Sequence, residues 1–249
     1  MIIIKNQREI ELMQAAGKVV GETLKLIEAS IRPGISTGEL DKICEEFIMK
    51  SGATPSFKNY NGFPGSICAS VNEVVVHGIP SKDKILQEGD IITIDCGAYL
   101  NGYHGDAART FRVGTVSEEA DGLIRITEES FFKGLEMAKV DYRIGDISNA
   151  IQNHLESNGL SVVRDFTGHG IGKDLHEGPS IPNYGLAHRG PKLRPGMALA
   201  IEPMANLGQY HVKVLEDNWT AVTRDGSWSA QYENTVIITE EGPLVTTLV

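Results

Sequence analysis

The sequence predicts an α+β protein made of two similar halves that face each other across a pseudo-twofold axis. Amphipathic helix patterns alternate with short strand patterns, and two strand segments share one layout. ILQEGDIITID ends at Asp95 and KLRPGMALAIE ends at Glu202, which gives an offset of 202 − 95 = 107. The same offset relates Gly52 to Gly159. Chance similarity between helix–strand units is the alternative that the residues alone leave open.

Two helices are predicted at the start of the chain. Residues 7–30 place apolar side chains three and four positions apart, the period of one helix face. The Arg-Pro-Gly sequence at 32–34 stops this helix. Ser36 and Glu39 form a capping-box pattern that opens a second helix, which ends at the Ser-Gly pair 51–52.

The later part of the chain repeats this order. Residues 118–138 are helical in pattern, and a short amphipathic helix is predicted to follow Gly145-Asp146 and to end at Asn158-Gly159. Residues 71–79 and 229–239 have the composition of strands, and the latter is predicted as the final strand, carrying Glu233.

The length of 249 residues suits one large domain or two small ones. We expect a single domain over 1–249, with halves of about 1–115 and 116–249.

Composition excludes several classes of protein. The net charge of −10 argues against a nucleic-acid partner, since phosphate binding needs a basic face. The three cysteines, at 44, 68 and 96, are not at metal-ligand spacing and are predicted to be free thiols in a reducing compartment. The apolar start is too short for a signal peptide, and no apolar run is long enough for a membrane span. We therefore expect a cytoplasmic protein without a membrane partner.

The stretch IITIDCGAYLNGYHGDAART carries two acids on a predicted hairpin. Asn101-Gly102 favours a two-residue turn, which pairs Gly97 with Asp106. Because side chains alternate along a strand, Asp95 and Asp106 then share one face as diagonal neighbours, with Cα atoms roughly 7–8 Å apart. Two carboxylates at this spacing repel each other unless a cation lies between them, so the hairpin predicts a divalent metal site. Two acids on an exposed edge hairpin are the alternative.

Three further side chains are candidate ligands for the same ions. His169 lies among glycines in TGHGIG, Glu202 ends the apolar run LAIE, and Glu233 lies in an alternating segment. One imidazole and four carboxylates suit Mn²⁺, Fe²⁺, Co²⁺ or Zn²⁺ better than a thiolate metal, and two ions better than one.

With these five residues the chain resembles the methionine aminopeptidases of the pita-bread fold, in particular the bacterial type I enzymes. Long matching stretches carry the resemblance: SICASVNEVVVHGIP, DIITIDCGAYLNGYHGDAARTF, TGHGIGKDLHE, PGMALAIEPM and AQYENTVIIT. The family fold, implied for this chain, has two pseudo-twofold-related halves with a curved antiparallel sheet covered by helices. The resemblance implies a metal-dependent aminopeptidase that removes the initiator methionine from nascent proteins.

The resemblance also implies a role for each metal ligand. Asp106 and Glu233 would bridge the two ions, Asp95 would bind one, and His169 with Glu202 would bind the other. A hydroxide bridging both ions would attack the substrate carbonyl, and Glu202 would act as general base and proton shuttle.

Further residues match the substrate-binding positions of the family. His77 would bind the peptide nitrogen next to the scissile bond, and His176 would stabilise the tetrahedral oxyanion. The remaining histidines are expected to be structural. The side chains that match the methionine pocket are Tyr60, Phe63, Cys68, Leu175 and Trp219.

The remaining implications concern ions and partners. Asn72, Val74 and Ser229 match a peripheral monovalent-cation site. The expected partners are N-termini of nascent polypeptides, association with the ribosome is left open, and the chain is expected to be a monomer. Two residues depart from the family pattern without an explanation from the sequence: Arg109, and Asn234 where the family usually has histidine.

Two other functions are weighed against this one. A proline-specific peptidase of the same fold would share the metal ligands. A binding module that lost its chemistry would typically lack them, whereas this chain has all five.

Overall fold

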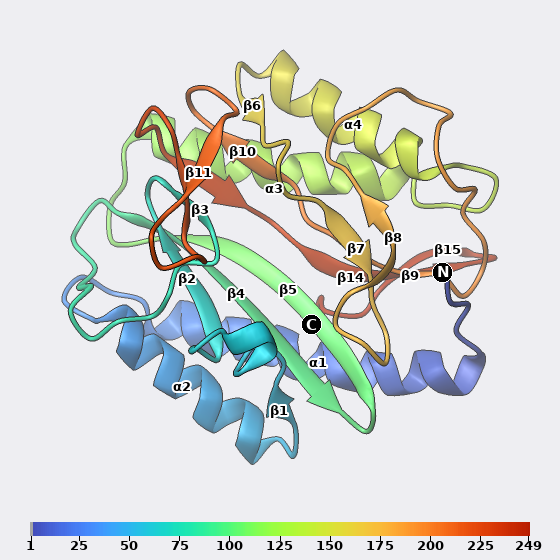
Figure 1. Ribbon diagram of the computed structural model, residues 1–249, viewed down its shortest axis with the longest axis horizontal. Helices are drawn as coiled ribbons and strands as arrows, with labels where there is room; N and C mark the ends of the chain where they lie inside the picture. The colour runs from blue at the N-terminus through green and yellow to red at the C-terminus, as the bar shows by residue number, and fades with distance from the viewer. Residues whose placement is uncertain (1) are drawn as a thin grey trace.

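The first two helices begin and end as the capping patterns predict. The computed structural model describes residues 2–249, with α1 at Gln7–Ser30 and α2 at Thr37–Lys50 (Figure 1). The Ser36 side chain accepts a hydrogen bond from the Glu39 backbone N–H, and the Glu39 carboxylate accepts one from the Ser36 N–H. These bonds satisfy two of the donors that a helix start leaves free.

A long hairpin forms the centre of the first half. Strands β4 (Ile91–Leu100) and β5 (Tyr103–Arg112) pair antiparallel around the Asn101-Gly102 turn. Strands β1 (Thr54–Pro55) and β2 (Ile67–Val71) pair with the other edge of β4. Helix α1 packs against β4 and β5.

The second half contains shorter strands in three sheets. One sheet has the order β13-β10-β6, one β15-β14-β9-β7-β8, and one β11-β12-β3, in which β3 comes from the first half. Every pairing between named strands within residues 2–249 is antiparallel. The bounds are β3 Val74–Val76, β6 Ser161–Val162, β7 Gly168–Gly170, β8 Glu177–Ile181, β9 Ala198–Ile201, β10 Met204–Asn206, β11 Val212–Val214, β12 Ala221–Thr223, β13 Ser229–Gln231, β14 Asn234–Thr239 and β15 Gly242–Val245.

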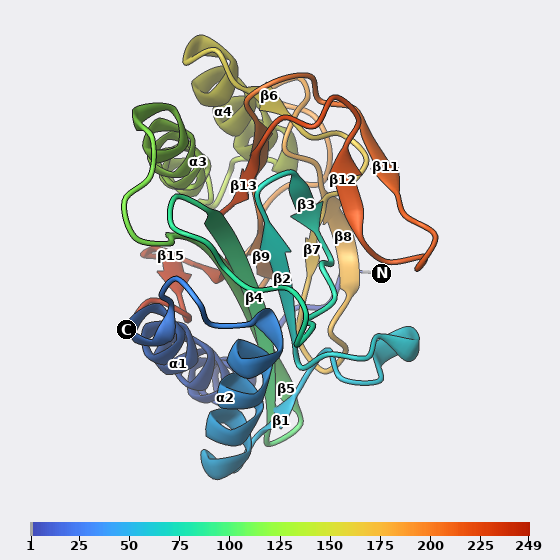
Figure 2. The ribbon, with the colours of Figure 1, turned by 90° about the vertical axis from the view of Figure 1, so that its left-hand side faces the viewer.

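Two more helices, α3 (Glu118–Glu136) and α4 (Ile144–Ser157), pack together over the second half. In Figure 1 they run along the edge opposite to α1 and α2, with the strands in between. Figure 2 shows both helix pairs on one side of the molecule, while the strands β3, β7 and β8 lie on the other side. A short 3₁₀ helix, η1 (Tyr60–Gly62), also lies on this second side.

The offset of 107 residues relates whole elements of the two halves. Adding 107 to the bounds of α2 gives 144–157, the bounds of α4, and adding it to those of β1 gives 161–162, the bounds of β6. The pairing of Thr54 with Tyr99 recurs as Ser161 with Asn206, because 54 + 107 = 161 and 99 + 107 = 206. The predicted α+β architecture of two related halves is confirmed.

Each half has its own apolar core between helices and sheet. Cys44 and Cys96 are fully buried in the first core, and all three cysteines are free, as predicted. Phe131 and Ile147 lie at the centre of the second core. Of the helices between residues 2 and 249, none combines the length and the apolar character needed to cross a membrane.

Four predicted boundaries are wrong. Helix α4 begins at Ile144, because the Asp146 carboxylate accepts the Arg143 N–H and so lies in the first turn rather than before it. Helix α3 ends at Glu136. Residues 71–79 are not one strand, since a turn with Asn72 at φ +54° separates β2 from β3. Residues 229–239 are interrupted at 232–233, and β15 follows them.

Candidate metal centre

Five strands or strand ends bring the five predicted ligands to one cavity of about 380 Å³. Asp95 lies in β4 and Asp106 in β5, while His169 lies in β7. Glu202 directly follows β9, and Glu233 occupies the break between β13 and β14. The cavity therefore collects ligands from both halves of the chain.

The hairpin register predicted from the Asn-Gly turn is confirmed. Gly97 pairs with Asp106, and Asp95 pairs with Ala108. Asp95 and Asp106 therefore share one face of the sheet, and both contribute to the cavity.

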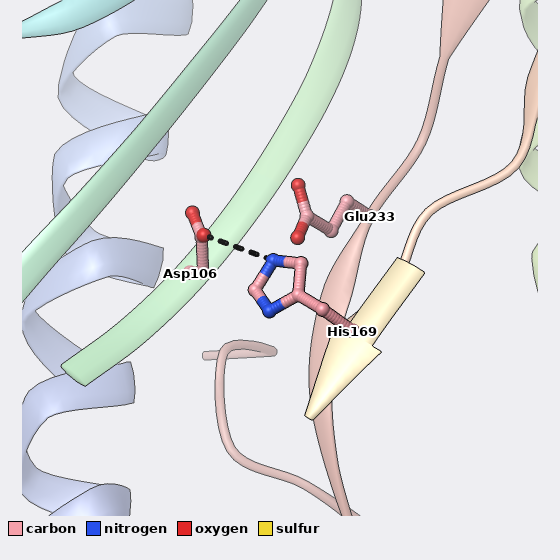
Figure 3. A group of neighbouring side chains, drawn as sticks. All are labelled: Asp106, His169 and Glu233. Atoms are coloured by element: carbon pink, nitrogen blue, oxygen red, sulfur yellow. Dashed lines mark ion pairs between the residues drawn. The ribbon is translucent and has the colours of Figure 1, made fainter. Parts of the chain in front are cut away.

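Three of the side chains converge closely. Asp106, His169 and Glu233 each offer one ligand atom, and these atoms lie within 4.8 Å of one another (Figure 3). The Nε2 atom of His169 is 3.9 Å from Oδ2 of Asp106 and 3.8 Å from Oε1 of Glu202. These separations are too long for hydrogen bonds, and they leave space in which one ion could contact several oxygen atoms and a nitrogen.

Hydrogen bonding orients the imidazole of His169. Its Nδ1 lies 2.8 Å from the carbonyl oxygen of Gly170, which only accepts, so Nδ1 carries the proton. Burial lowers the pKa of His169 to about 4, so the ring is neutral near pH 7. Nε2 therefore turns a free lone pair towards Asp106 and Glu202, as a metal ligand would.

The four carboxylates carry an uncompensated electrostatic cost. Burial raises the pKa of Asp95 to about 7, and burial together with the neighbouring acids raises the pKa values of Asp106, Glu202 and Glu233 well above the ordinary range. Throughout residues 2–249, Oδ1 of Asp95, Oδ1 of Asp106 and Oε1 of Glu233 are buried atoms without a hydrogen-bond donor. Buried anionic oxygens normally have partners. Divalent cations fit this donor set.

Backbone contacts between the halves fix the positions of two of the ligands. The Asp106 N–H donates to Oγ1 of Thr235 at 3.0 Å, and this hydroxyl donates to the Asp106 carbonyl at 2.9 Å. The Glu233 N–H donates to the Ala108 carbonyl at 2.9 Å. Asp106 on β5 is thus linked to the segment that carries Glu233.

The two predicted histidines outside the ligand set also face the cavity. His77 has φ +59°, an uncommon conformation for a residue other than glycine, and its ring packs edge-on against Phe166 with centroids 5.4 Å apart. Burial lowers the pKa of His77 to about 4, so it is neutral near pH 7. His176 bonds through Nδ1 to the Tyr60 hydroxyl at 2.7 Å, and its ring centroid lies 4.3 Å from that of His169.

An apolar wall adjoins these polar groups. It contains all five side chains predicted for the methionine pocket: Tyr60, Phe63, Cys68, Leu175 and Trp219. Phe63 and Trp219 meet edge to face with centroids 5.1 Å apart. Burial, with a smaller effect of Asp95, raises the pKa of the Cys68 thiol, which therefore stays uncharged.

The sequence reasoning missed several residues of the cavity. These are Phe57, Asn61, Val76, Asp165, Phe166 and Thr167. Phe166 and Thr167 directly precede the Gly-His-Gly segment of β7, which carries the predicted ligand His169. Their position next to this ligand in the sequence could have indicated that they line the cavity. Gln231 was also missed, although its Nε2 lies 3.4 Å from Oε2 of Glu202.

The residues predicted for a monovalent cation lie outside this cavity. Asn72 follows β2, Val74 begins β3, and Ser229 begins β13. The Ser229 N–H donates to the Asn72 carbonyl at 2.9 Å, so two of the three residues are in direct contact.

Comparisons with known proteins point to one family. The sequence model of the family described as metallopeptidase family M24 matches residues 11–240 of this chain. A protein of Clostridium perfringens named methionine aminopeptidase is 62% identical over 249 residues, which is 100% of both chains. Methionine aminopeptidase 1 of Bacillus subtilis is 56% identical and covers 97% of each chain.

Solved structures give the same result. The crystal structure of methionine aminopeptidase from Thermotoga maritima has a TM-score of 0.98 at 46% identity, with 99% of each chain covered. The Xaa-Pro dipeptidase from Bacillus anthracis reaches a TM-score of 0.80 at 27% identity, and this chain covers 62% of it. The chain therefore belongs to metallopeptidase family M24, which uses divalent metal ions, and within it to the bacterial methionine aminopeptidases.

Proposed function

We propose that this protein removes the N-terminal methionine from newly made polypeptides, using two divalent cations held in the cavity described above. The observation that supports it most is the convergence of one imidazole and four carboxylates, three with unpartnered buried oxygens, beside an apolar pocket. Relatives that match the whole chain and are named methionine aminopeptidase support the choice of substrate.

The five side chains divide between the two ions. When the ions are bound, Asp106 and Glu233 would hold both of them, Asp95 would hold one, and His169 with Glu202 would hold the other. Bound divalent cations lower the pKa of water towards 7 and polarise a carbonyl oxygen. The oxygen-rich ligand set suits Co²⁺, Mn²⁺, Fe²⁺ or Zn²⁺.

Glu202 is the residue that moves protons. Burial raises the pKa of its carboxylate, which helps it to hold a proton at Oε during the reaction. Gln231, 3.4 Å away, is placed to hold its orientation. Glu202 accepts a proton from the attacking water and passes it to the leaving amine.

The two histidines bind the scissile peptide. His77 is neutral and faces the cavity, where it holds the peptide nitrogen next to the bond that is cut. His176, oriented by Tyr60, stabilises the negative oxygen of the tetrahedral state. The methionine side chain lies among Phe63, Trp219 and the neutral Cys68 thiol, where sulfur–aromatic contacts favour a thioether.

Replacing His77 by Ala should lower kcat by about 10²–10³-fold, because the ring nitrogen that accepts the peptide N–H next to the scissile bond is lost. The dissociation constant of Mn²⁺ should stay at the parental value, since His77 is not a ligand. Steady-state kinetics on Met-Ala-Ser and calorimetric Mn²⁺ titration measure the two quantities. His154→Ala is the matched control, because His154 bonds to Glu129 away from the cavity. Parental turnover in His77→Ala would remove His77 from its role.

A metal-removal experiment tests the proposed function. Extensive treatment with EDTA should abolish cleavage of Met-Ala-Ser, and Co²⁺ or Mn²⁺ should restore it. Comparing the four metals by restored turnover then identifies the most active one. Full activity in excess chelator would contradict a metal-dependent peptidase.

A proline-specific peptidase is the second candidate, favoured by the fold similarity to the Xaa-Pro dipeptidase. Comparing kcat/KM for Met-Ala-Ser and an Xaa-Pro dipeptide separates the two functions. The methionine pocket predicts that Met-Ala-Ser is the better substrate, and the reverse preference would select the second candidate.

The setting of the enzyme completes the proposal. Residues 1–249 act as a single catalytic domain with halves of about 1–115 and 116–249. The substrates are N-termini of nascent chains, at the ribosome or after release, in the cytoplasm. We further propose that the protein acts as a monomer without membrane or nucleic-acid partners, which light scattering and sedimentation with ribosomes can test.

A further inference from the structure

Arg109 lies next to the metal centre but does not face it. It follows Asp106 by three positions on β5, so strand alternation points it to the opposite side of the sheet. There it contributes to a separate cavity together with Tyr232 and Glu128. Among the residues that the structure describes, no carboxylate lies within 4.0 Å of its guanidinium. The charge is thus not used in an ion pair.

The guanidinium instead binds the backbone around Glu233. Its Nη1 donates to the carbonyl oxygens of Ala108 and Glu233. Glu233 lies where β13 has ended and β14 has not begun, so its carbonyl has no ladder partner of its own. The N–H of Glu233 donates to Ala108, and Arg109 supplies the donor for its carbonyl. Both backbone polar groups of this ligand are therefore held by β5.

Two neighbours hold the guanidinium in its plane. Tyr232 stacks on it, and the Cζ atom of Arg109 lies 4.0 Å from the centroid of the tyrosine ring. Asn234, which is fully buried, accepts from Nη2 at 2.6 Å through its Oδ1. The same Oδ1 accepts from the Thr247 hydroxyl at 2.8 Å. Arg109 is thus oriented by the two residues that directly precede and follow Glu233 in the sequence.

This contact joins the two residues that the sequence left unexplained. An amide oxygen has two lone pairs and can accept from both Arg109 and Thr247, whereas a neutral imidazole has one acceptor nitrogen. Asparagine at 234 therefore suits a chain that has arginine at 109. The two departures from the family pattern form one unit.

We propose that Arg109, oriented by Asn234 and Tyr232, is a positioning residue that fixes the backbone of Glu233 and thereby its carboxylate in the metal centre. The inference rests on the proposed function, in which Glu233 would help to hold the metal ions. Groups that orient metal ligands typically change affinity or activity by about 10–100-fold when they are replaced.

The test measures Mn²⁺ binding by titration calorimetry and unfolding of the metal-free protein by scanning calorimetry. Arg109→Met should weaken Mn²⁺ binding by about 10–100-fold. Arg109→Lys keeps the charge but loses the planar fork, so it should recover only part of the affinity. Arg112→Met, on the same strand but in an exposed pair with Asp121, is the matched control and should bind Mn²⁺ like the parent.

Coupling between the two residues gives a second readout. Asn234→Ala should weaken Mn²⁺ binding on its own, but it should add little in the Arg109→Met background, because Asn234 acts through Arg109. If Arg109→Met does not fold, the affinity of Asn234→Ala decides. The inference would be overturned if a folded Arg109→Met or Asn234→Ala variant bound Mn²⁺ as tightly as the parent. It would also be overturned if the losses of Mn²⁺ affinity were fully additive in the double variant. A parent that neither binds Mn²⁺ nor cleaves Met-Ala-Ser would instead refute the proposed function.

Discussion

Glu202→Gln should lower kcat for Met-Ala-Ser by about 10²–10⁴-fold, the range for loss of a general acid–base group. Glutamine has the same shape and keeps an oxygen for the metal, but it cannot take up a proton from water. The fold should be retained, because Asn183 bonds to the backbone carbonyl of Glu202 and not to its side chain. Kinetics at saturating Mn²⁺, with thermal unfolding of the same samples, measure both properties.

A control separates this effect from a general loss of negative charge. Glu129 is an acid on α3, and its bonds to Arg125 and His154 lie away from the cavity. Glu129→Gln should keep parental turnover. If Glu202→Gln, saturated with metal, turned over within tenfold of the parent, Glu202 would not be the proton carrier.

Asp106→Asn should have opposite effects on stability with and without metal. Without metal, the variant should be more stable than the parent near pH 8 by about 1–3 kcal/mol, because a buried carboxylate oxygen without a donor is replaced by a neutral group. At about 2–4 °C per kcal/mol, the melting temperature should rise by several degrees. With Mn²⁺ at about 1,000 times the dissociation constant, the parent should gain about 4 kcal/mol that the variant lacks.

The pH dependence of the metal-free parent follows from the same carboxylates. Their pKa values are higher in the folded state than in the unfolded chain, so the folded protein binds more protons. The contribution of these carboxylates to stability should therefore be highest below about pH 4. It should fall as the pH rises to about 7, the pKa of Asp95, and beyond. Asp106→Asn should show a weaker fall.

Asp41→Asn is the matched control for this pair of effects. Asp41 is also a partly buried acid, but its Oδ1 accepts from the Ser66 and Ile67 N–H groups. Because these two N–H bonds partly offset its burial, its replacement should stabilise the metal-free protein less than Asp106→Asn does, and the Mn²⁺ stabilisation should stay parental. Equal effects of Asp41→Asn and Asp106→Asn would show that the cost is not specific to the metal centre.

Local rules account for the parts of the structure that could be predicted from the sequence. The capping box at Ser36 and Glu39 sets the start of α2, and the Asn101-Gly102 turn sets the register that brings Asp95 and Asp106 to one face. Both depend on residues close together in the chain. Asp95 and Glu202 could be related because their segments share one layout in the two halves.

The parts that were missed depend on contacts between distant segments. The pattern of residues 229–239 is that of one strand, but Arg109 and Ala108 on β5 bind the backbone of Glu233 and interrupt it. The contact of Phe166 with His77 likewise joins segments far apart in the sequence. No local pattern at Asn234 indicates that it accepts from Arg109.

An anomalous-scattering map of crystals loaded with Mn²⁺ tests the metal centre most directly. The account predicts two peaks in the cavity. One lies against Asp95 and the other against His169 and Glu202, and both lie within bonding distance of Asp106 and Glu233. A map with no ion among these five side chains, or with Mn²⁺ bound only elsewhere on the protein, would contradict the account.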